Sequence, residues 1–171
     1  GLQDRYISER LEVVTGGAER CHSVLNGLAH LAGKTDTDDW VLVHDAARPC
    51  VRLSDIEKLI ETLRATADGG LLGVPVADTM KQVDGNDRVT ATVARDGLWH
   101  AYTPQMFRLG RLQTALQYAI DNDLLVTDEA SAMELAGYLP RMVQGQRDNI
   151  KITVPSDLEL AAFYLQAGKQ S

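Results

Sequence analysis

The chain has 171 residues, of which 44% are hydrophobic, and a formal net charge of -7 at neutral pH. This length suffices for one hydrophobic core and does not demand a second domain. The distributed negative charge argues against a broad surface for nucleic acid or anionic membranes, because it repels phosphate groups. Any phosphate-bearing partner must therefore meet a local cluster of basic residues.

The cysteines and the start of the chain indicate a cytoplasmic protein. Cys21 and Cys50 lack metal-ligand spacing, so we expect reduced thiols and no structural zinc site. The opening GLQDRYISER lacks the basic and apolar regions of an export signal, and no apolar run approaches the ~18 residues of a membrane-spanning helix.

Short apolar runs alternate with helical periodicity in the first half of the chain. Residues 11–14, 40–43 and 71–76 are predicted to be strands. Helical faces recur at 21–31 and 56–63, the second preceded by a capping-box pattern of Ser54 and Glu57. Such strand and helix units predict a single α/β domain over residues 1–171, with a mostly parallel sheet covered by helices on both faces.

Residues 76–103 break this pattern and predict an antiparallel arm. Residues 80–83 and 89–93 flank a turn-rich Asp-Gly-Asn-Asp segment, which is typical of a hairpin. No helix in the pattern covers its apolar side chains. The arm either folds back on its own sheet or exchanges across a dimer interface, and the sequence favours neither.

The rest of the chain is predicted to be mainly helical. A helical face spans residues 112–120, and a second helix starts at Thr127 or Asp128 and stops at Gly137. Residues 150–154 are predicted to form a strand, and Ser156 to cap a last helix that runs to about residue 165.

Polar residues follow several of the predicted strands, where ligands of a parallel sheet bind. HDAARP, residues 44–49, places Asp45 and Arg48 there, although a solvated ion pair closing a loop is an alternative. Thr79, Lys81 and Lys151 have similar positions. The three basic residues at strand ends, Arg48, Lys81 and Lys151, would form an anion pocket, although a single lysine in such a place is more often an ordinary surface residue.

Two segments could approach a ligand through their backbone. Gly16-Gly17 precedes a helix and is either a ligand-binding turn or a plain one. Thr127-Asp128-Glu129 is a helix start, whose free N–H groups also bind phosphate. The four histidines show no metal-ligand spacing and are interpreted as structural.

Six motifs in order give the sequence its specificity: GGAERCHSV, HDAARP, DTMK, RDGLWHAYTPQ, TDEASAMELAG and DNIKIT. Together they resemble the methylerythritol phosphate cytidylyltransferase family. The resemblance implies a Rossmann-like nucleotidyltransferase fold whose projecting arm interlocks a homodimer.

Carried over motif by motif, the resemblance also implies roles for individual residues. It places Gly17, Ser23 and Ala46 along CTP and directs Lys151 at the α-phosphate. Residues that would surround the acceptor phosphate are Asp45, Arg48, Thr79, Arg95, Thr103 and Thr127. Lys151 and Arg95 are the expected catalytic residues, and Mg²⁺ would be bound mainly through the CTP phosphates.

The sequence departs from the family pattern in two places. Ala18 stands where members often have an acidic residue near the cytosine. The family's opening strand and glycine-rich triphosphate loop are not found, so about 60 family residues are expected to be absent and these 171 residues alone to be inactive.

The implied reaction is attack of a phosphomonoester oxygen on the α-phosphorus of CTP, with release of pyrophosphate. Two alternatives are a ribitol-phosphate cytidylyltransferase and a non-catalytic dimeric domain that binds a sugar-alcohol phosphate.

Overall fold

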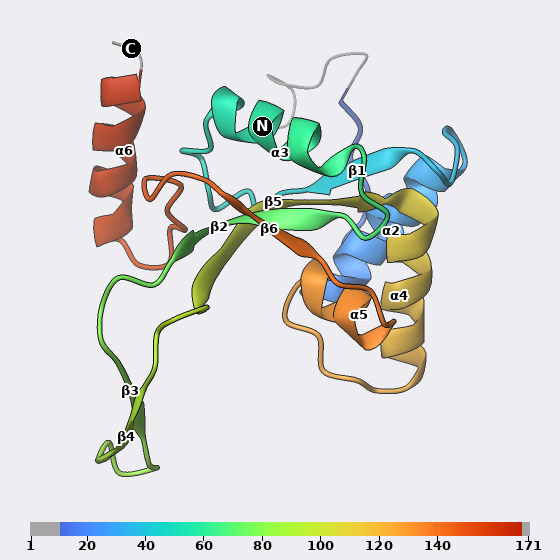
Figure 1. The fold of residues 1–171 in the computed structure, drawn as a ribbon. Coiled ribbons are helices and arrows are strands. Elements are labelled where there is room, and N and C mark those ends of the chain that lie inside the picture. The colour runs from blue at the N-terminus through green and yellow to red at the C-terminus, as the bar shows by residue number, and fades with distance from the viewer. Residues whose placement is uncertain (1–10, 169–171) are drawn as a thin grey trace. The chain divides into compact units, whose positions relative to one another are not determined.

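The computed structural model describes residues 11–168, which form an α/β fold as predicted (Figure 1). The chain divides into two compact units. The first comprises the N-terminal part up to Val41 together with Phe107–Tyr138, and the second comprises Leu42–Met106 and the part from Leu139 onwards. The single-domain organisation stays a prediction.

The described part of the first unit contains three helices: α2 (Arg20–Ala32), α4 (Leu109–Asp121) and α5 (Glu129–Leu135). Helix α4 packs against both of the others and buries its apolar face, as the periodicity predicts. The buried carboxylate of Glu129 accepts hydrogen bonds of 2.5 and 2.9 Å from the two Nη atoms of Arg20. This ion pair joins α2 to α5 and satisfies a charge that would be costly to bury alone.

The strand predicted at residues 11–14 is wrong. This segment has no regular structure, and Leu11, Val13 and Val14 are 46%, 63% and 37% exposed. An apolar run becomes a strand only when a ladder partner satisfies its backbone groups, and residues 11–14 have no strand pairing in the described part of the chain.

A four-stranded sheet has the order β1-β5-β2-β6 (Figure 1). Its strands are β1 (Trp40–Val43), β2 (Gly70–Pro75), β5 (Trp99–Arg108) and β6 (Arg141–Gln144). Strand β2 pairs in parallel with β6 and antiparallel with β5. The sheet is therefore mixed, which corrects the mostly parallel sheet predicted from the sequence.

Close approach of the strands explains a glycine in β2. A Cβ atom at Gly70 would lie 2.1 Å from the carbonyl oxygen of Arg141, its partner in β6. Any side chain there would push the two strands apart, so the parallel pairing depends on this glycine.

Strands β5 and β6 were missed, and the strand predicted at residues 150–154 is wrong. Pro104 lies inside β5 and argues against a strand on sequence grounds. Residues 150–154 form an irregular segment whose backbone bonds to another loop, from Ile152 N to the carbonyl of Ala47 at 2.8 Å.

Two helices belong to the second unit. Helix α3 (Leu53–Leu63) packs on β2 and β6, but its N-cap is Arg52, so the capping box predicted from Ser54 and Glu57 is wrong. Helix α6 (Ser156–Gly168) lies where a last helix was predicted, but Ser156 is its first helical residue and not its N-cap. The backbone N–H groups of Thr153 and Val154 donate to Asp157, which lowers the pKa of that carboxyl group.

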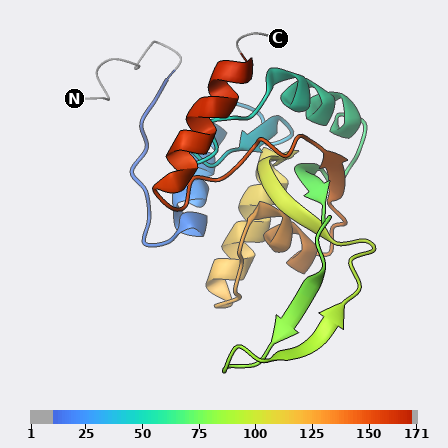
Figure 2. The ribbon, with the colours of Figure 1, turned by 90° about the vertical axis from the view of Figure 1, so that its left-hand side faces the viewer.

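The hairpin prediction is confirmed: β3 (Met80–Val83) and β4 (Val89–Val93) pair antiparallel and project from the end of β2 (Figure 2). Every residue of both strands is exposed. Met80, Val83, Val89 and Val93 expose between 38% and 61% of their surface. The arm therefore does not fold back on its own sheet, so the first of the two alternatives is excluded.

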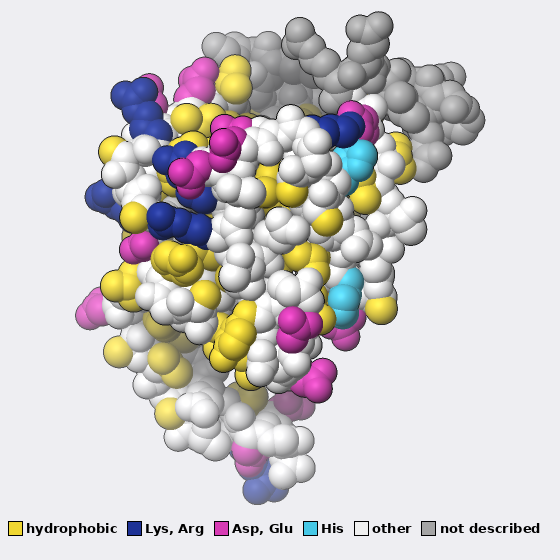
Figure 3. Space-filling model, turned by 90° about the vertical axis from the view of Figure 1, so that its right-hand side faces the viewer, with side chains coloured by type: hydrophobic (Ala, Val, Ile, Leu, Met, Phe, Trp, Pro, Cys, Tyr) yellow, Lys and Arg dark blue, Asp and Glu magenta, His cyan; other side chains and the backbone are white. Residues whose placement is uncertain are grey.

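Charged and apolar side chains are interspersed on the face of the molecule shown in Figure 3. Among residues 11–168, no helix is long and apolar enough to cross a membrane.

Replacing Leu59 by Ala should lower the free energy of unfolding by about 2–5 kcal/mol, because this α3 side chain is fully buried and the change leaves a cavity. Leu53→Ala on the same helix is the matched control, since Leu53 is 70% exposed. Urea denaturation measures both. Equal losses in the two variants would contradict the packing described for α3.

Candidate functional site

The HDAARP loop, residues 44–49, follows β1 and is organised around a buried arginine. Arg48 is only 8% exposed. Its Nη1 donates to the carbonyl of Asn149 at 2.8 Å, and its guanidinium carbon lies 4.6 Å from the centre of the Tyr102 ring. A carbonyl and an aromatic face thus replace much of the water that a guanidinium loses on burial.

Asp45 provides the negative charge in this loop. Its Oδ2 lies 3.8 Å from Nε of Arg48 and 3.1 Å from Nζ of Lys151. Burial lowers the pKa of Arg48, and the carboxylate of Asp45 partly offsets this shift. The Nε of Arg48 is buried with no hydrogen-bond partner among the described residues.

Thr103, on β5, connects the loop to the sheet. Its Oγ1 accepts the backbone N–H of Asp45 at 3.0 Å and lies 2.9 Å from Nδ1 of His44. The other ring nitrogen of His44 is 2.9 Å from the carbonyl of Arg48. This agrees with the interpretation of His44 as structural, and it makes Thr103 a residue that positions the loop.

Lys151 lies in the segment that was predicted to be a strand. Neighbouring residues anchor this segment: Gln146 N donates to Asp55 at 3.0 Å, and Nε of Arg52 donates to Asp148 at 2.9 Å. The side chain of Lys151 itself is 45% exposed. An anchored backbone with an exposed ammonium group is suited to receive a phosphate.

Asn149 was missed as a site residue, although it stands inside the DNIKIT motif. It is 1% exposed, and its side-chain amide donates to the carbonyl of Thr103 at 2.8 Å while its own carbonyl accepts from Arg48. Its burial between two loops is a tertiary property that no local pattern reveals.

Thr79 and Arg95 lie at the base of the arm, and both are exposed. Nη1 of Arg95 donates to the carbonyl of Ala77, which joins the two sides of the arm where it leaves the sheet. No described hydrogen bond or ion pair joins Arg95 to the cluster of Asp45, Arg48 and Lys151.

Gly17, Ser23 and Thr127 belong to the first unit. The N–H of Gly17 donates to Oγ of Ser23 at 2.9 Å, and a Cβ at Gly17 would lie 2.3 Å from Cβ of His22. Asp128, rather than Thr127, is the N-cap of α5, and it forms a reciprocal capping box with Ser131. Thr127 is exposed beside it.

The second unit thus gathers Asp45, Ala46, Arg48, Thr103 and Lys151 around one loop, with Thr79 and Arg95 at the arm base. A cluster with two cations and one carboxylate can bind an anion and hold it in a fixed orientation. The assignment of these residues to a substrate stays a prediction.

Comparison with known proteins decides the family. The model of the family described as 2-C-methyl-D-erythritol 4-phosphate cytidylyltransferase matches residues 2–167. The chain belongs to this family.

Individual cytidylyltransferases are similar over nearly the whole chain. The enzyme of that name from Photobacterium profundum is 51% identical over 161 residues, which cover 92% of this chain and 68% of the relative. The one from Pseudomonas putida is 55% identical over 158 residues, or 91% and 67% of the two chains. The present chain thus spans about two thirds of the length of these relatives.

Solved cytidylyltransferase structures have the same fold. The Francisella tularensis enzyme superposes with a TM-score of 0.85 at 43% identity and covers 93% of this chain and 74% of its own. The Thermus thermophilus enzyme gives 0.75 at 30% identity, with 92% and 78% covered. These structures confirm the nucleotidyltransferase fold predicted from the motifs.

Replacing Thr103 by Val should cost about 1–3 kcal/mol in the free energy of unfolding, because the Asp45 N–H and the His44 ring lose a partly buried hydrogen-bond partner. Thr90→Val is the control, since Thr90 is exposed on the arm and a surface change is worth within about 0.5 kcal/mol. Chemical denaturation of both variants tests this. A loss no larger than the control's would remove Thr103 from its positioning role.

Proposed function

We propose that this protein transfers CMP from CTP to 2-C-methyl-D-erythritol 4-phosphate, giving 4-diphosphocytidyl-2-C-methyl-D-erythritol and pyrophosphate. The observation that carries the proposal is the cluster of Arg48, Asp45 and Lys151 around the HDAARP loop, in a chain of this family. The relatives described above carry the methylerythritol name, so nothing favours ribitol phosphate as the acceptor.

The acceptor phosphate needs no catalytic base. The second pKa of a phosphomonoester is about 6, so the nucleophilic oxygen is already charged near neutral pH. The residues of the site contribute by orienting the two substrates and by balancing charge that shifts toward the leaving pyrophosphate. Lys151 is suited to the α-phosphate because its ammonium group is nearly half exposed on an anchored segment.

Acceptor binding is assigned to Asp45, Arg48, Thr79, Arg95, Thr103 and Thr127, and contact with CTP to Gly17, Ser23 and Ala46. The backbone of Gly17 lies tightly against His22, where a side chain would not fit, so this position requires glycine for packing alone. Thr103 contributes indirectly, since its hydroxyl is already bonded to Asp45 N and His44.

Mg²⁺ is part of the proposal as a companion of CTP. This ion prefers oxygen ligands and is commonly held by one or two carboxylates together with substrate phosphates. Asp45 offers a carboxylate in the cluster, but one of its oxygens is already 3.1 Å from Nζ of Lys151. The residues therefore fit a metal ion carried mainly by the triphosphate, where it would neutralise charge on the leaving group.

A homodimer formed through the arm completes the proposal. The arm exposes apolar residues on both strands, and such a surface is stabilised when a second copy covers it. A cytoplasmic location fits Cys21 and Cys50, which form no disulfide.

Arg48→Ala should weaken acceptor use about 10- to 100-fold at the full family length, because a charge-assisted contact contributes about 1.5–3 kcal/mol. Steady-state kinetics with varied acceptor measure this, and Arg64→Ala is the control because Arg64 is exposed at the end of α3. Circular dichroism checks that the variant folds. Unchanged KM and kcat in a folded variant would reduce Arg48 to a structural residue.

A mixed dimer tests whether Arg95 acts on the partner's site. Arg95→Ala and Lys151→Ala, each inactive alone at the full family length, place their lesions in different sites if Arg95 acts across the interface. One site of the mixed dimer then carries both defects and the other carries neither. Mixing the variants after reversible dissociation should restore up to about half the activity per mixed dimer.

The control for this experiment is a tagged pull-down that demonstrates mixed dimers. If they form and no activity returns, Arg95 acts within its own chain. If the protein is monomeric at the assay concentration and still active, catalysis does not require a dimer, and Arg95 does not act on a partner's site.

A further inference from the structure

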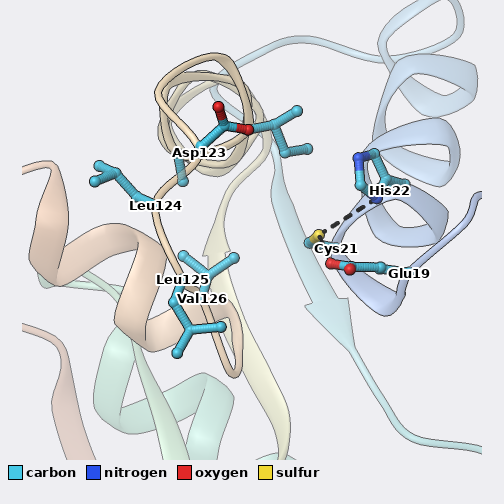
Figure 4. Close-up of a pocket in the computed structure, with 9 residues that line it drawn as sticks. Glu19, Cys21, His22, Asp123, Leu124, Leu125 and Val126 are labelled. Atoms are coloured by element: carbon cyan, nitrogen blue, oxygen red, sulfur yellow. Dashed lines mark hydrogen bonds between the residues drawn. The ribbon is translucent and has the colours of Figure 1, made fainter.

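Three side chains with the donor atoms of a transition-metal site converge at the start of α2. Glu19, Cys21 and His22 each offer one ligand atom, and these atoms all lie within 4.8 Å of one another. Figure 4 shows the carboxylate of Glu19 and the ring of His22 on either side of the Cys21 sulfur. The sequence interpretation treated His22 as structural because its spacing resembles no familiar metal motif.

Two of the separations between these atoms are close to the edges of a metal tetrahedron. Zinc binds sulfur at about 2.3 Å and imidazole nitrogen at about 2.0–2.1 Å, which places the two donors about 3.6 Å apart at the tetrahedral angle. Sγ of Cys21 lies 3.6 Å from Nδ1 of His22 and 3.9 Å from Oε2 of Glu19. The separation between Cys21 and Glu19 exceeds this edge by a few tenths of an ångström, and the exposed side chain of Glu19 is able to move closer.

The backbone leaves the carboxylate of Glu19 available. Glu19 is the N-cap residue of α2 with extended backbone angles, yet its side chain makes no capping hydrogen bond. Its backbone carbonyl accepts from Ser23 N at 3.1 Å instead, which fixes the turn while the carboxylate points to Cys21. The positive end of the helix dipole also suits a site with two anionic ligands.

Arg20, the positively charged residue nearest to the three ligands in the sequence, is paired with another residue. Arg20 lies between Glu19 and Cys21, but both of its Nη atoms donate to the carboxylate of Glu129. Its charge is therefore balanced by another residue of the same unit.

The site opens into a pocket of about 320 Å³. The opposite wall comes from the end of α4 and the following turn, with Asp123, Leu124, Leu125 and Val126 (Figure 4). Three protein ligands and access to solvent leave a fourth position for water, which is the arrangement of an open zinc site.

We propose that Glu19, Cys21 and His22 bind a borderline-soft divalent cation, for which Zn²⁺ is the best match. A thiolate and an imidazole select Zn²⁺ and similar ions over Mg²⁺, which prefers oxygen ligands. This site is chemically different from the Mg²⁺ that accompanies CTP.

The test uses Co²⁺ as a spectroscopic probe and Zn²⁺ as its competitor. Metal-free, reduced chain is titrated with Co²⁺ and should show a thiolate-to-Co²⁺ charge-transfer band and the strong visible bands of four-coordinate Co²⁺, saturating at one ion per chain. Zn²⁺ should bleach both, because Zn²⁺ binds nitrogen and sulfur sites more tightly than Co²⁺. The measurement is spectroscopic and does not depend on enzyme activity.

Matched variants assign the ligands. Cys21→Ser should abolish the charge-transfer band, and His22→Ala and Glu19→Gln should each weaken binding at least about tenfold. Cys50→Ser and His30→Ala are the controls and should keep the wild-type spectrum, since Cys50 is a buried thiol of the other unit and His30 lies elsewhere on α2.

Two results would overturn the proposal. One is the absence of a charge-transfer band in the wild-type chain, and the other is a band that survives in Cys21→Ser or disappears in Cys50→Ser. If Cys21→Ser does not fold by circular dichroism, the other two ligand variants decide, and unchanged Zn²⁺ affinity in both would sink the assignment.

Discussion

The burial of Arg48 is the constraint on which the rest of the HDAARP loop depends. A guanidinium that is 8% exposed must recover the hydration it loses, and here it does so through the carbonyl of Asn149, the ring of Tyr102 and the charge of Asp45. Each partner comes from a different part of the chain. The arginine thereby fixes how the HDAARP loop, β5 and the DNIKIT segment lie against one another.

This arrangement combines buried residues, which hold the cluster together, with Lys151, whose ammonium group is paired with Asp45 but remains exposed. Arg48, Thr103 and Asn149 are buried, and each is hydrogen-bonded or ion-paired within the cluster. Lys151 is exposed, although its backbone belongs to a segment pinned by neighbouring hydrogen bonds. The ammonium group can therefore move with a phosphate during a reaction, while the anchored backbone keeps the side chain at the site.

The sequence predicts elements whose signal is local and misses those that depend on distant partners. Helix α4 and the hairpin of β3 and β4 follow from periodicity and turn residues alone. Strand β5 was missed because Pro104 argues against a strand, and residues 11–14 were misread because an apolar run says nothing about whether a partner strand exists. The candidate site residues came from motifs, whereas Asn149 became visible only through its burial.

The net charge of the cluster, compared with the charge of the acceptor phosphate, favours a role for the arm in the proposed reaction. Within the cluster, Asp45 cancels one of the two positive charges of Arg48 and Lys151, which leaves a single net positive charge. A phosphomonoester near neutral pH carries close to two negative charges. Arg95 is exposed at the base of an arm whose two strands, within the described residues, pair only with each other, so a second copy could present it to this cluster. The additional cation would then match the charge of the acceptor phosphate, and the site would be electrostatically complete only in the dimer.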